Sequence, residues 1–199
     1  MLILNNVYLP LDYNFADMIP AAEKELRVKR NEIKSARLFR KSVDARRKDN
    51  VRFCCSVIVE PNGKEQPLLK KCKKAQIYRE NKYIFPKDVG FDGNARPVVV
   101  GFGPAGMFAA LTLAKAGLKP IVYERGYDVD TRTKDVKAFF ESGILNTESN
   151  VQFGEGGAGT FSDGKLTTGI KSPFIKKILE ELYEAGAPEE ILYSSKPHI

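Results

Sequence analysis

Three glycines in the spacing Gly-x-Gly-x-x-Gly, beginning at Gly101, suit the binding of a phosphate. They follow the β-branched run Val98–Val100 and open a run of small residues that predicts a helix over about 104–116. Gly101 would allow the sharp turn out of the strand, Gly103 a close approach of the backbone to a pyrophosphate, and Gly106 close packing of the helix on the sheet. The N–H groups at the helix start, aided by the helix dipole, would bind the phosphate charge.

An acidic residue ends the apolar run that follows this helix. Residues 119–123 predict a second strand, and Glu124 comes directly after it. At that position a carboxylate can accept hydrogen bonds from both ribose hydroxyls of an adenosine, and it repels a 2′-phosphate. Strand, glycine turn, helix, strand and acid together predict a dinucleotide-binding βαβ unit, although the motif by itself does not distinguish FAD from NAD.

A second glycine-rich stretch covers residues 154–164, where five of eleven residues are glycine. Such a loop can bring backbone N–H donors close to a flat or phosphorylated ligand. Thr160 and Ser162 would add hydroxyl donors and Lys165 a cation. Asp163 and Lys165 are candidates for acid–base chemistry only through their place in this loop, so the catalytic residues stay unassigned.

Arg132 lies in the next expected helix, within 127–143, which Gly143 would end. Its guanidinium could donate two hydrogen bonds to a phosphate. It could equally form a salt bridge with neighbouring residues. The sequence does not choose between these two roles.

The first part of the chain predicts a separate small domain over residues 1–85. Its periodicity and turn residues predict strands over 2–11, 35–43, 51–59 and 75–79, and helices over 15–29 and 66–74. The resulting order, β-α-β-β-α-β, suits a ferredoxin-like α+β fold.

The remainder of the chain is expected to form a linker and the start of a nucleotide-binding domain. Residues 86–97 contain two prolines and two glycines, which is typical of a linker. Residues 98–199 are expected to be the N-terminal part of the second domain. They include an amphipathic helix within 172–185 and the beginning of a strand over 191–195.

The composition excludes several classes of protein. The 199 residues suffice for one medium domain or two small ones, and no apolar run has transmembrane length. The N-terminus lacks the basic start and long apolar region of a signal peptide, so we expect a cytoplasmic protein without membrane contact. Three cysteines without Cys-x-x-Cys spacing and a single histidine, His198, argue against a disulfide framework, a metal site and a Ser-His-Asp arrangement.

Positive charge is concentrated in the first half of the chain. Residues 1–97 carry 21 Lys or Arg against 12 Asp or Glu, whereas residues 98–199 carry 11 against 13. This asymmetry is one sign of two domains. Small basic domains of this element order can bind nucleic acid. The charge runs over 44–49 and 70–74 are more typical of a solvated hairpin tip and a solvated helix face.

The segment Arg96–Leu111 resembles the start of the flavin domain in glutathione-reductase-like flavoproteins. Within that class, the whole chain is similar to the uncharacterised FAD-dependent dehydrogenases, also called NAD(FAD)-utilising dehydrogenases. Ser149–Leu166 is the most distinctive part of the resemblance, and Ser42–Lys48 is similar to the basic small domain that precedes the flavin domain in that family. The resemblance implies an α/β fold: an incomplete Rossmann-like, three-layer ββα domain for FAD or NAD(P), preceded by the small ferredoxin-like domain.

The resemblance also implies which residues would bind FAD. Residues near the ADP half would be Gly101, Gly103, Pro104, Ala105, Gly106, Glu124 and Arg125. Residues near the pyrophosphate and isoalloxazine would be Gly157, Gly159, Thr160, Ser162 and Lys165. Members of the family are much longer than this chain, which lacks their substrate-binding segment and the late strand that completes the flavin site. We therefore expect an N-terminal fragment, inactive alone, of an FAD-dependent, dehydrogenase-like oxidoreductase.

Two alternatives remain beside this hypothesis. Residues 1–97 could be a basic module that binds RNA or an acidic partner, with a structural or sensing dinucleotide site in the rest of the chain. The first glycine motif could also hold NAD in place of FAD. The sequence names no small-molecule substrate, and NAD(P)H is one candidate electron donor.

Overall fold

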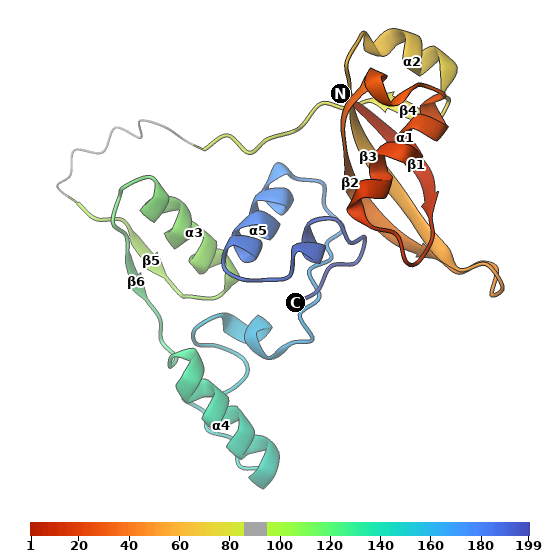
Figure 1. Ribbon diagram of the computed structural model, residues 1–199. Coiled ribbons are helices and arrows are strands. Elements are labelled where there is room, and N and C mark those ends of the chain that lie inside the picture. Colours follow the sequence, from red (N-terminus) through yellow and green to blue (C-terminus); the bar gives the residue numbers. More distant parts are fainter. Residues whose placement is uncertain (86–94) are drawn as a thin grey trace. The chain divides into compact units, whose positions relative to one another are not determined.

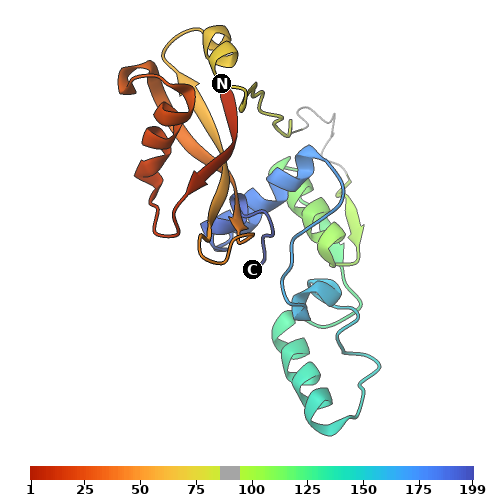
Figure 2. The same cartoon turned by 90° about the vertical axis from the view of Figure 1, so that its right-hand side faces the viewer.

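The structure, a computed structural model, describes residues 1–85 and 95–199 and divides the chain into two compact units (Figures 1 and 2). The first unit combines Met1–Tyr83 with Leu166–Ile199, and the second contains Ile84–Lys165. This division differs from the expected one at residue 98, because the C-terminal 34 residues pack with the N-terminal part. Most of the expected linker lies outside the described residues.

The N-terminal part of the first unit is a four-stranded antiparallel sheet with two helices (Figure 1). Its strands are β1 (Leu2–Leu9), β2 (Ile33–Asp44), β3 (Arg52–Pro61) and β4 (Ala75–Ile77), and its helices are α1 (Met18–Leu26) and α2 (Glu65–Lys71). Short 3-10 helices precede α1 (Phe15–Asp17) and β2 (Arg30–Glu32). The predicted order β-α-β-β-α-β is confirmed, and in space the strands lie in the order β2-β3-β1-β4.

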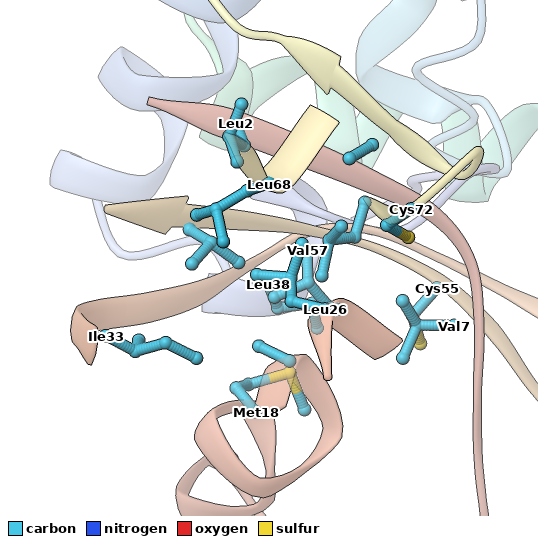
Figure 3. Close-up of a cluster of buried hydrophobic side chains, with 14 of the residues drawn as sticks. Leu2, Val7, Met18, Leu26, Ile33, Leu38, Cys55, Val57, Leu68 and Cys72 are labelled. Carbon is cyan, nitrogen blue, oxygen red and sulfur yellow. The ribbon is translucent and has the colours of Figure 1, made fainter. Parts of the chain in front are cut away.

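The hydrophobic core of this part lies between α1 and one face of the sheet. Met18 and Leu26 lie on the same side of α1 and are almost completely buried. Figure 3 shows them beside Leu38 and Val57, which come from β2 and β3. Alternate residues of a strand point to the same face, so the apolar positions of the central strands meet the apolar face of the helix.

The C-terminal part of the first unit contains α5 (Pro173–Glu184) and a 3-10 helix over Glu189–Leu192. Ser172 caps α5 by accepting a hydrogen bond from Phe174 N. The predicted strand over 191–195 is wrong, because the 3-10 helix occupies its beginning and Ser194 makes only an isolated bridge to Lys41 of β2. Lys41 N donates to Tyr193 O at 2.7 Å, and Ser195 N donates to Lys41 O at 2.8 Å.

The second unit is built around two parallel strands, β5 (Val98–Val100) and β6 (Ile121–Tyr123), with α3 (Pro104–Lys115) between them in sequence. Helix α4 (Val129–Ser142) follows, and its backbone ends at Gly143 in the left-handed conformation, φ 73°. The loop after α4 returns beside that helix and forms a 3-10 helix over Gly157–Phe161 (Figure 2). The predicted strand–helix–strand order is confirmed.

Membrane-spanning helices and metal-binding clusters are both absent from the described residues. No helix there has both the length and the apolar character needed to cross a membrane. No group of three or more His, Cys, Asp or Glu side chains there is arranged to hold a metal ion.

Candidate dinucleotide-binding site

The first glycine motif forms the turn between β5 and α3. Gly101 has a φ of 92°, a conformation that side-chain-bearing residues rarely adopt, and its N–H donates to Tyr123 O of β6 at 2.7 Å. This bond continues the pairing of the two parallel strands by one residue. The chain therefore leaves the sheet sharply and enters the helix at Pro104.

Gly106 is required for the contact between α3 and the end of β5. A Cβ atom at this position would lie 2.0 Å from Gly101 O and 3.5 Å from Val99 Cγ1. The absence of a side chain therefore lets the first turn of the helix lie directly on the turn that precedes it. This is the role that the spacing predicts for the third glycine.

The start of α3 is open to a ligand. Gly103 is the N-cap residue and has no side chain to cap the helix, so the first N–H groups of α3 have no partner within the helix. Pro104 and Ala105 are both exposed. A Cβ atom on Gly103 would approach no neighbour more closely than 3.9 Å. Backbone donors and the positive end of a helix dipole thus meet at an accessible surface, the arrangement that binds anions.

Glu124, at the end of β6, connects the glycine turn to the residues after the strand. Its carboxylate accepts hydrogen bonds from Gly126 N at 2.8 Å and from Phe102 N at 2.5 Å. These N–H donors, that of Gly126 first, hold the pKa of Glu124 below its ordinary value of 4.5. A carboxylate has about four acceptor positions, so Glu124 can organise the turn and still accept hydrogen bonds from a ligand.

The second glycine stretch lies directly against the first. Gly156 N donates to Phe102 O at 2.8 Å. A Cβ atom on Gly157 would lie 3.2 Å from Gly103 Cα and 3.3 Å from Pro104 Cδ. A Cβ atom on Gly126 would lie 2.5 Å from Gly154 Cα. The two stretches therefore meet backbone to backbone beside the start of α3.

Arg132 of α4 binds the loop that contains this second stretch through hydrogen bonds to backbone carbonyls. The side chain is completely buried, and its guanidinium donates to four carbonyl oxygens: those of Asn150, Val151, Glu155 and Gly157. Its charge also lies over the ring of Phe161, 4.9 Å from the centroid. The sequence suggested a phosphate contact or a salt bridge, and it carried no signal for this set of carbonyl partners.

The other expected site residues lie on or near the two glycine stretches. Thr160 Oγ1 donates to Glu155 O at 3.2 Å, and Ser162 Oγ donates to Gly159 O at 2.8 Å. The hydroxyls thus form hydrogen bonds within the loop itself. Lys165 forms an exposed ion pair with Asp163 at 2.6 Å.

Arg125 is exposed and lies over the ring of Phe153, with 4.8 Å to the centroid. Glu155 was not among the expected residues. Its side chain accepts a hydrogen bond from Val129 N at 2.7 Å and so ties the second glycine stretch to the start of α4. A glutamate between glycines carries no sequence signal for this contact, because its partner is 26 residues away.

Comparisons with known proteins agree with this geometry. Residues 96–146 match the FAD binding domain family, and this region contains the first glycine motif, α3, β6 and α4. Residues 1–60 match a family described only as a domain of unknown function (DUF8436). An uncharacterised protein of Clostridium beijerinckii is 49% identical over 198 residues, which is 98% of this chain and 37% of that relative. The chain thus spans little more than a third of the length of this relative.

The comparisons support an FAD-binding segment within a mixed α/β protein. The match of the N-terminal residues names no ligand. Neither match bears on nucleic-acid binding.

Proposed function

We propose that the second unit binds FAD and that the protein is an FAD-dependent oxidoreductase of the dehydrogenase type. The main support is the contact between the two glycine stretches beside the start of α3, which has no side-chain cap. The first of these stretches lies within the region that matches the FAD binding domain family. FAD would supply the redox chemistry by accepting a hydride or electrons at its ring. The protein would supply position and electrostatics.

The proposed contacts follow from where each group lies. The N–H groups at the start of α3 would bind the pyrophosphate, and Glu124 would accept hydrogen bonds from the adenosine ribose. Residues proposed for the ADP half are Gly101, Gly103, Pro104, Ala105, Gly106, Glu124 and Arg125. Residues proposed for the region of the pyrophosphate and flavin ring are Gly157, Gly159, Thr160, Ser162 and Lys165.

The finer fold assignments belong to the same proposal. The parallel pairing of β5 and β6, joined in sequence by α3, supports a Rossmann-like fold for the second unit. The strand order β2-β3-β1-β4 in an antiparallel sheet supports a ferredoxin-like origin of the N-terminal sheet. On this view the chain is part of a longer enzyme with a small-molecule substrate and NAD(P)H as a candidate electron donor, and its location is the cytoplasm.

Cofactor titration of the purified 199-residue chain tests the proposal. The protein is titrated with FAD, NAD and NADP, and binding is measured by flavin absorbance and fluorescence and by calorimetry. We expect saturable binding of FAD, weaker binding of NAD and the weakest binding of NADP, because the carboxylate of Glu124 repels a 2′-phosphate. A preference for NAD over FAD would support the alternative nucleotide, and no uptake of FAD would contradict the proposal.

A pair of glutamate variants makes the test specific to the site. Glu124→Ala removes the acceptor at the end of β6, and we expect FAD affinity to fall at least tenfold. Glu141→Ala removes an exposed carboxylate of α4 that forms an ion pair with Lys137, at 3.9 Å, and is expected to leave FAD affinity unchanged. Equal FAD affinity in the wild type and Glu124→Ala would refute the ribose contact.

A further inference from the structure

The buried guanidinium of Arg132 has an unusual environment. None of the ion pairs found among residues 1–85 and 95–199 includes this side chain, and all its hydrogen-bond partners are backbone carbonyls. Its Nε is buried without a hydrogen-bond partner. A buried charge is costly unless it is well hydrogen-bonded. Four carbonyl oxygens meet most of this cost, so the buried guanidinium is part of the hydrogen bonding of the loop.

The hydrogen bonds of Arg132 join several points of the loop after α4 to one side chain. Nη2 alone reaches the carbonyls of Asn150, Val151 and Gly157, at 3.2, 3.2 and 3.0 Å, while Nη1 reaches that of Glu155. These carbonyls all lie within residues 150–157 of the loop after α4. A planar guanidinium with five donors can hold several oxygens at once, which an ammonium group does with less geometric control.

The loop packs tightly against the Arg132 side chain at Gly154, where there is no space for a Cβ atom. Gly154 has a φ of 105°, and a Cβ atom there would lie 2.4 Å from Arg132 Cδ. Backbone N–H groups of the loop beside the guanidinium donate hydrogen bonds that join the loop to the first glycine motif and to the start of α4. Gly156 N donates to Phe102 O, and Glu155 N donates to Tyr127 O at 3.1 Å.

We propose that Arg132 is a positioning residue for the dinucleotide site. It binds carbonyls within and just before the second glycine stretch and thereby holds the N–H groups of that stretch in place, without touching the cofactor itself. The proposal rests on the proposed function in one respect: the ligand whose affinity depends on Arg132 is FAD.

The first measurement needs no cofactor. Hydrogen exchange of the wild type, Arg132→Lys and Arg132→Met is followed by mass spectrometry on peptides that cover residues 150–164. We expect the loop amides to exchange at least tenfold faster in Arg132→Met, with Arg132→Lys intermediate, while β1 and β3 keep wild-type protection. Unchanged loop exchange in both variants would overturn the proposal.

The second measurement is the FAD dissociation constant of the same proteins. We expect it to rise at least tenfold in Arg132→Met and less in Arg132→Lys. Lys137→Met is the control, because Lys137 lies on the same helix with its side chain 76% exposed. Weaker FAD binding with unchanged loop exchange would indicate a direct phosphate contact and would overturn the positioning role, as would faster loop exchange with unchanged FAD affinity.

A rescue experiment separates positioning from general destabilisation. Guanidinium ion at millimolar concentration is expected to restore part of the FAD affinity of Arg132→Ala, whereas ammonium ion at the same ionic strength is not. No difference between the two ions would contradict the proposal. If wild-type protein binds no FAD at all, the proposed function fails, and the exchange data still decide whether Arg132 orders the loop. If Arg132→Met does not fold, Arg132→Lys carries both measurements.

Discussion

The glycines at 103 and 106 permit one sharp test of the site, because the structure assigns them different tasks. Alanine at either position adds a single methyl group within the same turn. At Gly106 that methyl would lie 2.0 Å from Gly101 O, far inside the 3.0 Å below which real Cβ contacts are essentially never found. At Gly103 its nearest neighbour would be 3.9 Å away, an ordinary contact.

The distances set the expected magnitudes. To accommodate alanine at 106, the first turn of α3 must move by about 1 Å away from the glycine turn. Overpacking of this kind costs about 1–3 kcal/mol, and the better helix propensity of alanine offsets up to about 1 kcal/mol of it. We therefore expect Gly106→Ala to destabilise the second unit by about 2 kcal/mol. Gly103→Ala should leave stability within about 0.5 kcal/mol of the wild type.

Cofactor affinity should show the opposite contrast for Gly103. Its methyl group would project where the backbone is proposed to approach the pyrophosphate, so FAD binding should weaken at least tenfold in a protein of wild-type stability. Urea unfolding followed by far-UV circular dichroism measures stability, and hydrogen exchange of residues 98–123 assigns the loss to the second unit. Gly63→Ala, with no atom within 4 Å of its added Cβ, is the control for both measurements.

Two results would refute this reasoning. Wild-type stability of Gly106→Ala would show that α3 does not need the close approach seen in the structure. Wild-type FAD affinity of Gly103→Ala would show that the pyrophosphate lies elsewhere, even if the fold is correct.

Further predictions concern single side chains of both units. The pKa of Glu124 is lowered in the folded protein, so its carboxylate stabilises the fold above its ordinary pKa of 4.5. This contribution is lost as the pH falls through the lowered value. The stability difference between wild type and Glu124→Gln in urea titrations should therefore be largest near pH 7 and shrink at acidic pH. Glu80→Gln breaks the ion pair with Lys176 of α5, which also holds the pKa of Glu80 down, so limited proteolysis should cut near α5 faster, and an unchanged rate would contradict this. Leu26→Ala empties a completely buried position and should lower the stability of the N-terminal sheet by about 3 kcal/mol, while FAD affinity of the folded protein stays unchanged; a loss of affinity would show that the two units are coupled.

Much of the local structure could be predicted because it depends on neighbours in sequence. The buried face of α1 repeats every four residues, at Met18, Ala22 and Leu26, and this spacing can be recognised in the sequence. Gly143 ends α4 as predicted, because a left-handed C-terminal residue depends only on backbone conformation within a few residues. The glycine spacing after β5 likewise predicted a turn whose sterics are local.

Other features could not be predicted because their partners are distant in sequence. The sequence does not reveal that Glu124 accepts a hydrogen bond from Phe102 N, because Phe102 lies 22 residues earlier. The expected strand after α5 is only a single bridge, because its one partner is the edge strand β2 and a 3-10 helix occupies its first residues. The association of residues 166–199 with the N-terminal part has the same origin: no local pattern indicates which of two apolar surfaces a helix will cover.

Reading the amino-acid sequence was enough to predict the strand–glycine turn–helix–strand order, the acid after the second strand and a second glycine-rich stretch. These are properties of short segments, in which backbone conformation and side-chain periodicity decide the outcome. The contact between the two glycine stretches, backbone to backbone, and the burial of Arg132 against the second stretch became visible only in the folded chain. Glycines can form such a contact anywhere, and a guanidinium binds carbonyls wherever the chain brings them. The meeting point is therefore set by the packing of α4 and its returning loop.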